Sequence, residues 1–279
     1  MHAIKPKLAT LESTGHAQPE CADRHAGTAA AGYQPHFVFT LSARGKEADL
    51  PVMAFLRTFF PRMPLTQIDS LFGFVERCTL YGGRFFRTPQ LSATDVEAMY
   101  AHRIGLRIPF TNHMVDEQEY ASYGWMLDKY HRPGNAVIVT NDKLARWVRR
   151  DFPRYRIEAS VIKDIDTHAK IGKALEIYDT VVLPMRSNQD EAFLTAINDK
   201  SRITLFANAG CALTCPSKIC YPSVSKANKT ITGGRLLCSV PLKARNAIGM
   251  VDFDLDQLGA LGFSRFKMLR ERVGAGSGY

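Results

Sequence analysis

Residues 136–161 read AVIVTNDKLARWVRRDFPRYRIEASV and contain a complete strand–helix–strand pattern. Ala136–Thr140 is a short apolar run with β-branched residues, which is typical of a strand buried on both faces. Asp142–Phe152 follows with apolar residues at helical spacing, and Arg156–Val161 is a second β run. Two strands joined by a helix in this way predict a βαβ unit with parallel strands.

The same alternation continues in both directions from this segment. We expect eight strands, at Phe37–Leu41, Ile68–Phe72, Gly105–Phe110, Ala136–Thr140, Arg156–Val161, Thr180–Leu183, Ile203–Ala207 and Phe263–Leu269. Amphipathic segments lie between most of them, at Leu50–Phe60, Ala93–His102, Glu117–Tyr130, Asp142–Phe152, Asp166–Ile177 and Gln189–Asn198. This order predicts an α/β fold, a (β/α)8 TIM-like barrel. About 55 residues without a clear long helix separate the last two strands, so we expect an elaborated insertion there.

Four cysteines lie in this insertion. Cys211, Cys215 and Cys220 have the spacing C-x3-C-x4-C, and Cys238 follows after seventeen further residues. Thiolates are soft ligands, and a set of four suits an iron–sulfur cluster or a zinc ion. The spacing differs from the C-x3-C-x2-C pattern of radical-SAM enzymes. The remaining alternative is a pair of disulfides or scattered buried thiols, which would be more typical of a secreted domain.

Polar residues fall at or just past the ends of several predicted strands, where (β/α)8 enzymes carry their active sites. Arginine can hold a carboxylate through two parallel hydrogen bonds, so arginines near this rim are candidate substrate anchors. Each single residue could equally serve as a turn or helix cap. The candidate substrate-binding residues are Arg84, Asn112, Asn141, Ser160, Arg186, Asn208 and Arg270.

Composition and charge describe a chain that can bury a full core. It has 279 residues, of which 46% are hydrophobic, and its 36 basic against 27 acidic residues give a net charge of +9. This excess favours an anionic partner, either a small substrate or RNA. The sequence has no apolar run long enough for a membrane span and no signal-peptide core. We therefore expect a cytoplasmic protein with reduced cysteines.

The chain divides into three predicted parts. Residues 1–34 lack periodicity and predict a disordered extension, which includes Cys21. Residues 35–272 form the predicted barrel domain, and residues 273–279 a flexible tail. We expect Cys78 to be a core thiol outside the ligand set.

Several segments resemble, in order, the collagenase-like peptidase family U-32 and its single-barrel iron–sulfur relatives. The matching stretches are Ile68-Asp-Ser-Leu-Phe-Gly73 with Tyr81-Gly-Gly-Arg84, Gly105-Leu-Arg-Ile-Pro-Phe-Thr-Asn112, Asn135-Ala-Val-Ile-Val-Thr-Asn141, Asn208-Ala-Gly-Cys211, Cys215-Pro216, and the closing stretch from Asp254 through Phe266-Lys267. The resemblance covers roughly Phe37 to Arg272. The family's peptidase signature, a glutamate segment with a downstream Gly-Ala-x-Cys, is absent here.

The resemblance implies a 4Fe–4S cluster held by Cys211, Cys215, Cys220 and Cys238. It also implies oxygen-independent hydroxylation of a quinone precursor or of a nucleotide in RNA, with prephenate as the hydroxyl donor. Some relatives work in pairs, so a heteromeric partner of the same family is a further expectation. The leading hypothesis is therefore an iron–sulfur barrel enzyme for redox or hydroxyl-transfer chemistry. The alternatives are a non-catalytic partner subunit stabilised by a cluster or by zinc, and a peptidase-like hydrolase.

Overall fold

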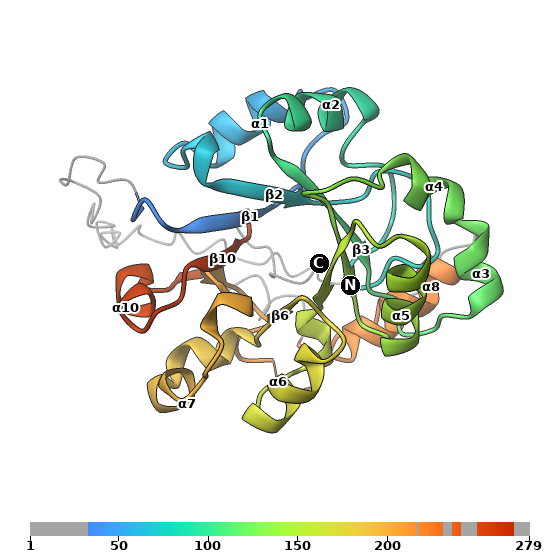
Figure 1. Cartoon of the computed structure of the whole chain (residues 1–279). Helices are drawn as coiled ribbons and strands as arrows, with labels where there is room; N and C mark the ends of the chain where they lie inside the picture. The colour runs from blue at the N-terminus through green and yellow to red at the C-terminus, as the bar shows by residue number, and fades with distance from the viewer. Residues whose placement is uncertain (1–32, 216, 231–235, 241–249, 271–279) are drawn as a thin grey trace, which may run out of the picture. The chain divides into compact units, whose positions relative to one another are not determined.

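The computed structural model describes residues 33–215, 217–230, 236–240 and 250–270 (Figure 1). The predicted tail at 273–279 and Cys21 lie outside the described residues, as does the predicted extension except for its last two residues. Tyr33 and Gln34 contact the barrel: the Tyr33 ring lies 4.8 Å from that of Phe39, and the carbonyl of Gln34 accepts from Gln67 Nε2 at 2.7 Å.

Eight parallel strands close into a barrel in the spatial order β1, β10, β7, β6, β5, β4, β3, β2. The predicted (β/α)8 fold is confirmed. Each strand agrees with its predicted range to within two residues at either end. The strands are β1 (Val38–Ser42), β2 (Ile68–Phe72), β3 (Gly105–Phe110), β4 (Ala136–Val139), β5 (Arg156–Ala159), β6 (Thr180–Val182), β7 (Ile203–Phe206) and β10 (Arg265–Met268).

Helices surround the strands on the outside of the barrel (Figure 1). They are α1 (Val52–Phe59), α2 (Ala93–Ala101), α3 (Glu117–Ser122), α4 (Gly124–Lys129), α5 (Asp142–Asp151), α6 (His168–Leu175), α7 (Glu191–Thr195), α8 (Cys220–Lys229) and α10 (Leu255–Ala260). The predicted helix Glu117–Tyr130 is interrupted at Tyr123, directly before Gly124, which is a poor helix former. Within the described part of the chain, none of the helices has the length and apolar character needed to cross a bilayer.

The barrel interior holds many buried polar side chains, among them Thr40, Ser70 and Thr204, and contains one network of buried charges. Arg107 on β3 pairs with Glu158 on β5, and its other Nη atom lies 2.7 Å from Asp69 Oδ2 on β2. Lys267 on β10 reaches the same glutamate from the opposite side, with Nζ 3.1 Å from Oε1. Burial alone would raise the pKa of Glu158, but Arg107 and Lys267 outweigh it and keep the pKa below the usual value. The strands are thus tied across the barrel by ion pairs.

The insertion between β7 and β10 contains a helix, so the expectation of no clear long helix there is wrong. Helix α8 has ten residues, CYPSVSKANK, and few strong helix formers. Its Pro222 is tolerated because the first backbone N–H groups of a helix have no partner within it. The insertion also contains a two-stranded antiparallel sheet of β8 (Asn208–Ala209) and β9 (Val251–Asp252).

Tertiary hydrogen bonds fasten α8 to the loops that follow β2 and β3. Asn112 Nδ2 donates to the carbonyl of Ser225 at 3.0 Å, and Asn228 Nδ2 donates to the carbonyls of Tyr81 and Arg84 at 2.9 and 2.8 Å. The helix is therefore specified by contacts far away in the sequence, which a local pattern does not reveal.

Candidate functional site

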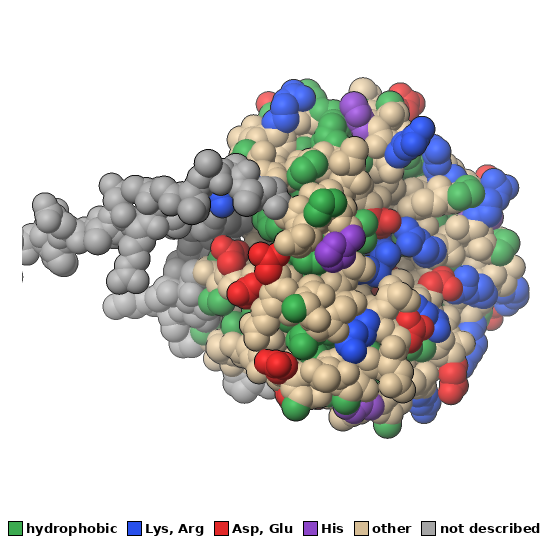
Figure 2. Space-filling view, turned by 60° about the vertical axis from the view of Figure 1, so that its left-hand side comes forward, with side chains coloured by type: hydrophobic (Ala, Val, Ile, Leu, Met, Phe, Trp, Pro, Cys, Tyr) green, Lys and Arg blue, Asp and Glu red, His purple; other side chains and the backbone are tan. Residues whose placement is uncertain are grey.

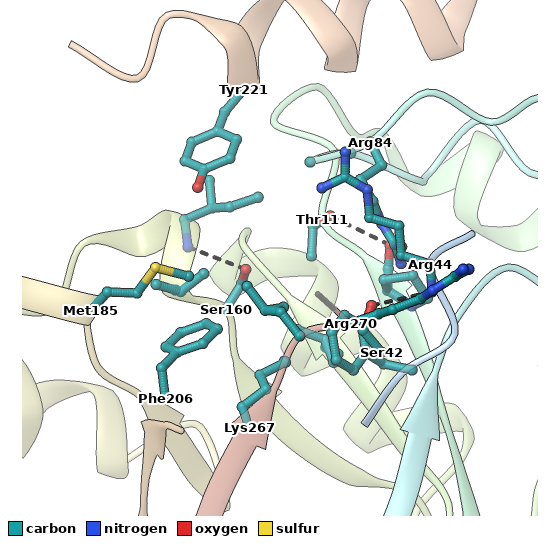
Figure 3. A pocket seen from close by; sticks show the side chains of 18 residues that line it. Ser42, Arg44, Arg84, Thr111, Ser160, Met185, Phe206, Tyr221, Lys267 and Arg270 are labelled. Atoms are coloured by element: carbon teal, nitrogen blue, oxygen red, sulfur yellow. Dashed lines mark hydrogen bonds between the residues drawn. The ribbon is translucent and has the colours of Figure 1, made fainter. Parts of the chain in front are cut away.

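A cavity lies at the carboxyl-terminal ends of the barrel strands (Figure 3). Its volume, with the open mouth included, is about 710 Å3. We call it the mouth cavity. Its polar lining is Ser42, Arg44, Arg84, Thr111, Ser160, Tyr221, Lys267 and Arg270, and its apolar lining includes Phe72, Ile138, Val161, Ile162, Met185, Phe206 and Leu269. Among the described residues that line it, four are cationic and none is acidic.

Two glycines place Arg84 in this cavity. A Cβ atom on Gly82 would lie 2.2 Å from the carbonyl oxygen of Thr111, so no other residue fits against the loop after β3. Gly83 has a φ of +71°, in the left-handed region that glycine adopts without strain. The turn they form is closed by a 2.8 Å hydrogen bond from the Arg84 N–H to the Gly82 carbonyl.

The guanidinium of Arg84 is enclosed but is not neutralised by a nearby acid. It lies over the rings of Phe72 and Phe74, at 5.5 and 5.2 Å from their centroids. Its Nη1 atom is buried and has no hydrogen-bond partner among the described residues. Burial, with a smaller effect of the neighbouring Arg44, lowers the pKa of Arg84. An anion in the cavity would supply the missing partner and offset this desolvation.

Two further cations lie at the same end of the barrel. Arg270 stacks on Phe59, with its guanidinium carbon 3.4 Å from the ring centroid, and donates to the carbonyl of Gly45. Lys267 lies over Phe72 at 4.4 Å while its ammonium pairs with Glu158. The Glu158 ion pair thus links the floor of the mouth cavity to the charge network of the barrel interior.

The mouth cavity has a cationic side and an apolar side. Figure 3 shows Arg44, Arg84 and Arg270 on one side and Met185 and Phe206 on the other. Ser160 lies between them, where its hydroxyl accepts from the Ile162 N–H at 3.2 Å and caps the short 3-10 helix η2 (Val161–Lys163). An anion with an apolar body fits this arrangement.

The structure brings three of the seven candidate substrate-binding residues together in this cavity. These are Arg84, Ser160 and Arg270. Asn141 instead caps α5, where its Oδ1 accepts from the Lys143 N–H at 2.9 Å. Asn208 exchanges two hydrogen bonds with the backbone of Leu269, at 2.8 and 2.9 Å.

Of the other two candidates, Asn112 holds α8 in place and Arg186 pairs with carboxylates of the loop after β5. Asn112 is buried and bonds to α8 as described above. Arg186 makes a bidentate ion pair with Asp164, at 2.8 and 3.0 Å, and also contacts Asp166 at 2.7 Å. Sequence reasoning missed Arg44, Tyr221 and Lys267 as lining residues. Arg44 lies three residues past the end of the predicted first strand, and this position is the signal that could have identified it.

The four cysteines of the insertion line a second cavity. Cys211, Cys215, Cys220 and Cys238 surround it together with Ala212, Lys218, Tyr221 and Val240, and we call it the cysteine cavity. No disulfide links the five cysteines of the described residues. In the same part of the chain, no set of three or more Cys, His, Asp or Glu side chains is arranged to hold a metal ion directly.

The thiol of Cys215 is in a polar environment, unlike that of Cys78. Burial would raise the pKa of Cys215, but hydrogen bonds from Ser239 and from two backbone N–H groups, with the charge of Lys218, lower it. Cys78 is buried elsewhere, and burial raises its pKa well above the usual value. Cys78 lines a different cavity, between the loop after β2 and the end of α8.

The sequence matches no protein-family model and no curated protein. The structure, however, is similar to the solved structure of the U32 peptidase Mk0906, with a TM-score of 0.57. The match covers 90% of this chain and 98% of that chain at 12% sequence identity. The fold resembles that of a U32 peptidase. The resemblance predicted from the motifs is therefore confirmed at the level of the fold.

Proposed function

We propose that this chain is an iron–sulfur protein that acts on a small anionic substrate in an oxygen-independent redox or hydroxyl-transfer reaction. Cys211, Cys215, Cys220 and Cys238 would hold the 4Fe–4S cluster. The observation that carries the proposal is that these cysteines, predicted from spacing alone, line one cavity, and that this cavity shares Tyr221 with the cationic mouth cavity.

The donor set supports a soft metal centre. Four cysteine side chains line the same cavity, and the lowered pKa of Cys215 favours the thiolate that ligation requires. A cluster of this kind supplies one-electron transfer when it is bound. A zinc ion with four cysteine ligands would leave no position for water, and its role would be structural. The lack of a disulfide among the described cysteines also fits the predicted cytoplasmic location.

The mouth cavity supports an anionic substrate. Arg44, Arg84 and Arg270 would bind and orient its charged group, while Met185 and Phe206 would exclude water from the rest of it. Hydroxyl transfer from an organic donor needs no external oxidant, because the acceptor exchanges a C–H bond for C–OH and the donor exchanges C–OH for C–H.

RNA remains an alternative partner. On the face shown in Figure 2, Lys and Arg side chains are interspersed with Asp and Glu, so that this face is not uniformly cationic. The enclosed site for an anion is the mouth cavity, which favours a small molecule over a nucleic-acid backbone as the group held there. A zinc-stabilised partner subunit and a peptidase-like hydrolase also remain alternatives.

Anaerobic purification from iron-replete cells tests the proposal. We expect a brown protein with broad visible absorption that bleaches in air or with dithionite, and with about four iron and four sulfide per chain. Stoichiometric zinc without iron would overturn the proposed iron–sulfur cluster, and the cysteines would then hold a structural zinc ion. Absence of both metals would remove the metal hypothesis.

A further inference from the structure

Tyr221 is common to the mouth cavity and the cysteine cavity. It is the second residue of α8 and directly follows Cys220, one of the four cysteines. Figure 3 shows its ring descending from α8, with the hydroxyl directed into the mouth cavity. One face of the mouth cavity is therefore formed by a side chain whose backbone belongs to the cysteine segment.

The backbone that carries this ring is anchored on both sides of Tyr221. The hydrogen bonds from Asn112 and Asn228 attach α8 to the loops after β3 and β2, and His113 adds a further one, from its backbone N–H to Ser225 Oγ at 3.2 Å. On the other side, the ion pair of Lys218 with Asp164 at 3.0 Å holds the cysteine segment just before the helix. The backbone of Tyr221 thus lies between two anchored segments.

We propose that Tyr221 is the partition between the two cavities, a positioning residue that shields the group held by the cysteines and presents the mouth cavity's contents to it. This inference rests on the proposed function. A large aromatic ring excludes water over a wide area with little loss of conformational entropy. A substrate anchored at Arg84 with its apolar body toward Met185 would lie beneath this ring.

Removing the ring has a definite electrostatic consequence. A cluster with four thiolates gains negative charge on reduction, and water stabilises the more highly charged state. Opening the partition would therefore raise the reduction potential of the cluster and admit oxidants from the mouth cavity. Loss of the Tyr221 hydroxyl alone would leave the ring, and therefore the partition, in place.

The test compares anaerobically purified Tyr221→Ala and Tyr221→Phe with Ile162→Ala as the matched control. Ile162 lines the mouth cavity but not the cysteine cavity, and it is partly exposed. Its truncation to alanine therefore widens the mouth cavity and leaves the cysteine cavity unchanged. Two quantities are measured: the rate at which visible absorption is lost after mixing with air, and the midpoint potential in a redox titration. We expect Tyr221→Ala to bleach about tenfold faster and to have a higher potential, while the other two variants stay close to the unaltered protein.

A Tyr221→Ala protein that bleaches no faster than Ile162→Ala would overturn the partition. So would equal acceleration in Tyr221→Phe, because the hydroxyl rather than the ring would then be responsible. If Tyr221→Ala is isolated without its cluster, Tyr221→Leu, which retains more bulk, gives the same comparison. An unaltered protein without iron or sulfide contradicts the proposed function instead. In a protein that contains zinc, the rate of zinc transfer to a chelator tests the partition in the same variants.

Discussion

Lys218 Nζ lies 3.0 Å from Asp164 Oδ1 and joins the cysteine segment to the loop after β5. Both residues have positive φ angles, 47° and 53°, in a region that side chains other than glycine adopt at a cost in free energy. Arg186 holds the same carboxylate from the other side. This aspartate therefore helps to fix how the cysteine segment sits on the barrel.

We expect Asp164→Asn to loosen the cysteine segment without unfolding the barrel. Asparagine tolerates the left-handed backbone, so the substitution removes the charge and keeps the turn. Because the pair is partly exposed, its loss should cost about 1 kcal/mol, which corresponds to roughly fivefold faster loss of bound metal. The measurement is metal released to a chelator over time. Lys129→Ala, which breaks the surface pair with Glu76, is the control and should release metal at the unaltered rate.

Arg84→Met should weaken the binding of small anions. The Gly82–Gly83 turn places the guanidinium of Arg84 at the cavity. A charge-assisted hydrogen bond from it to an anion contributes about 1.5–3 kcal/mol, which is roughly a tenfold to hundredfold change in affinity. Titration calorimetry with benzoate and with inorganic phosphate measures the change. Arg149→Met, on the outer helix α5 and paired with Asp179, is the control. Unchanged affinity in Arg84→Met, or no binding of either anion by the unaltered protein, would contradict this assignment.

Glu158→Gln should destabilise the barrel by about 3–5 kcal/mol, because it leaves Arg107 and Lys267 buried without their shared carboxylate. The pKa of Glu158 is lower in the folded protein than in the unfolded chain. The ion pairs therefore contribute stability above about pH 4.3, and that stability is lost as pH falls through the folded-state pKa. The free energy of unfolding, measured with urea between pH 3 and pH 7, should fall less steeply toward low pH in Glu158→Gln than in the unaltered protein. An equally steep fall in both proteins would show that other carboxylates control acid unfolding.

The barrel could be predicted from sequence because its determinants are local. Strands buried on both faces have continuous apolar runs, as in Ala136–Val139, and such runs can be recognised from the sequence alone. Helix α8 could not be predicted in the same way. Its residues have weak helical propensity, and contacts from Asn112 and Asn228 stabilise it. The local pattern therefore gives no sign of Tyr221, which lines both cavities.

The candidate site shows the same division. The spacing of the cysteines predicted which thiols share a cavity, because they lie close together in one insertion. For the polar residues at strand ends, the sequence shows where each residue stands but not which way its side chain points. Asn141 points back to cap its own helix, whereas Arg84 is turned inward by two glycines. Only the packing of the loops distinguishes these two outcomes.

The last prediction concerns the roles of the individual cysteines. Replacing Cys211, Cys215, Cys220 or Cys238 with serine should in each case reduce bound iron and sulfide severalfold or more, since oxygen is a poorer ligand than thiolate for a soft metal. Cys78→Ser is the internal control. Its thiol is buried, lines the cavity at the end of α8 and is not part of the cysteine cavity, so metal content should stay near the unaltered value.

Iron and sulfide analysis of the five single variants separates the outcomes. Retention in Cys238→Ser with loss in Cys78→Ser would mean that the fourth ligand is wrongly assigned. Retention in Cys211→Ser, Cys215→Ser and Cys220→Ser together would contradict any metal at this site. The contrast is sharp because Cys78 lies after β2, on the same rim of the barrel, and yet faces the core rather than the cysteine segment.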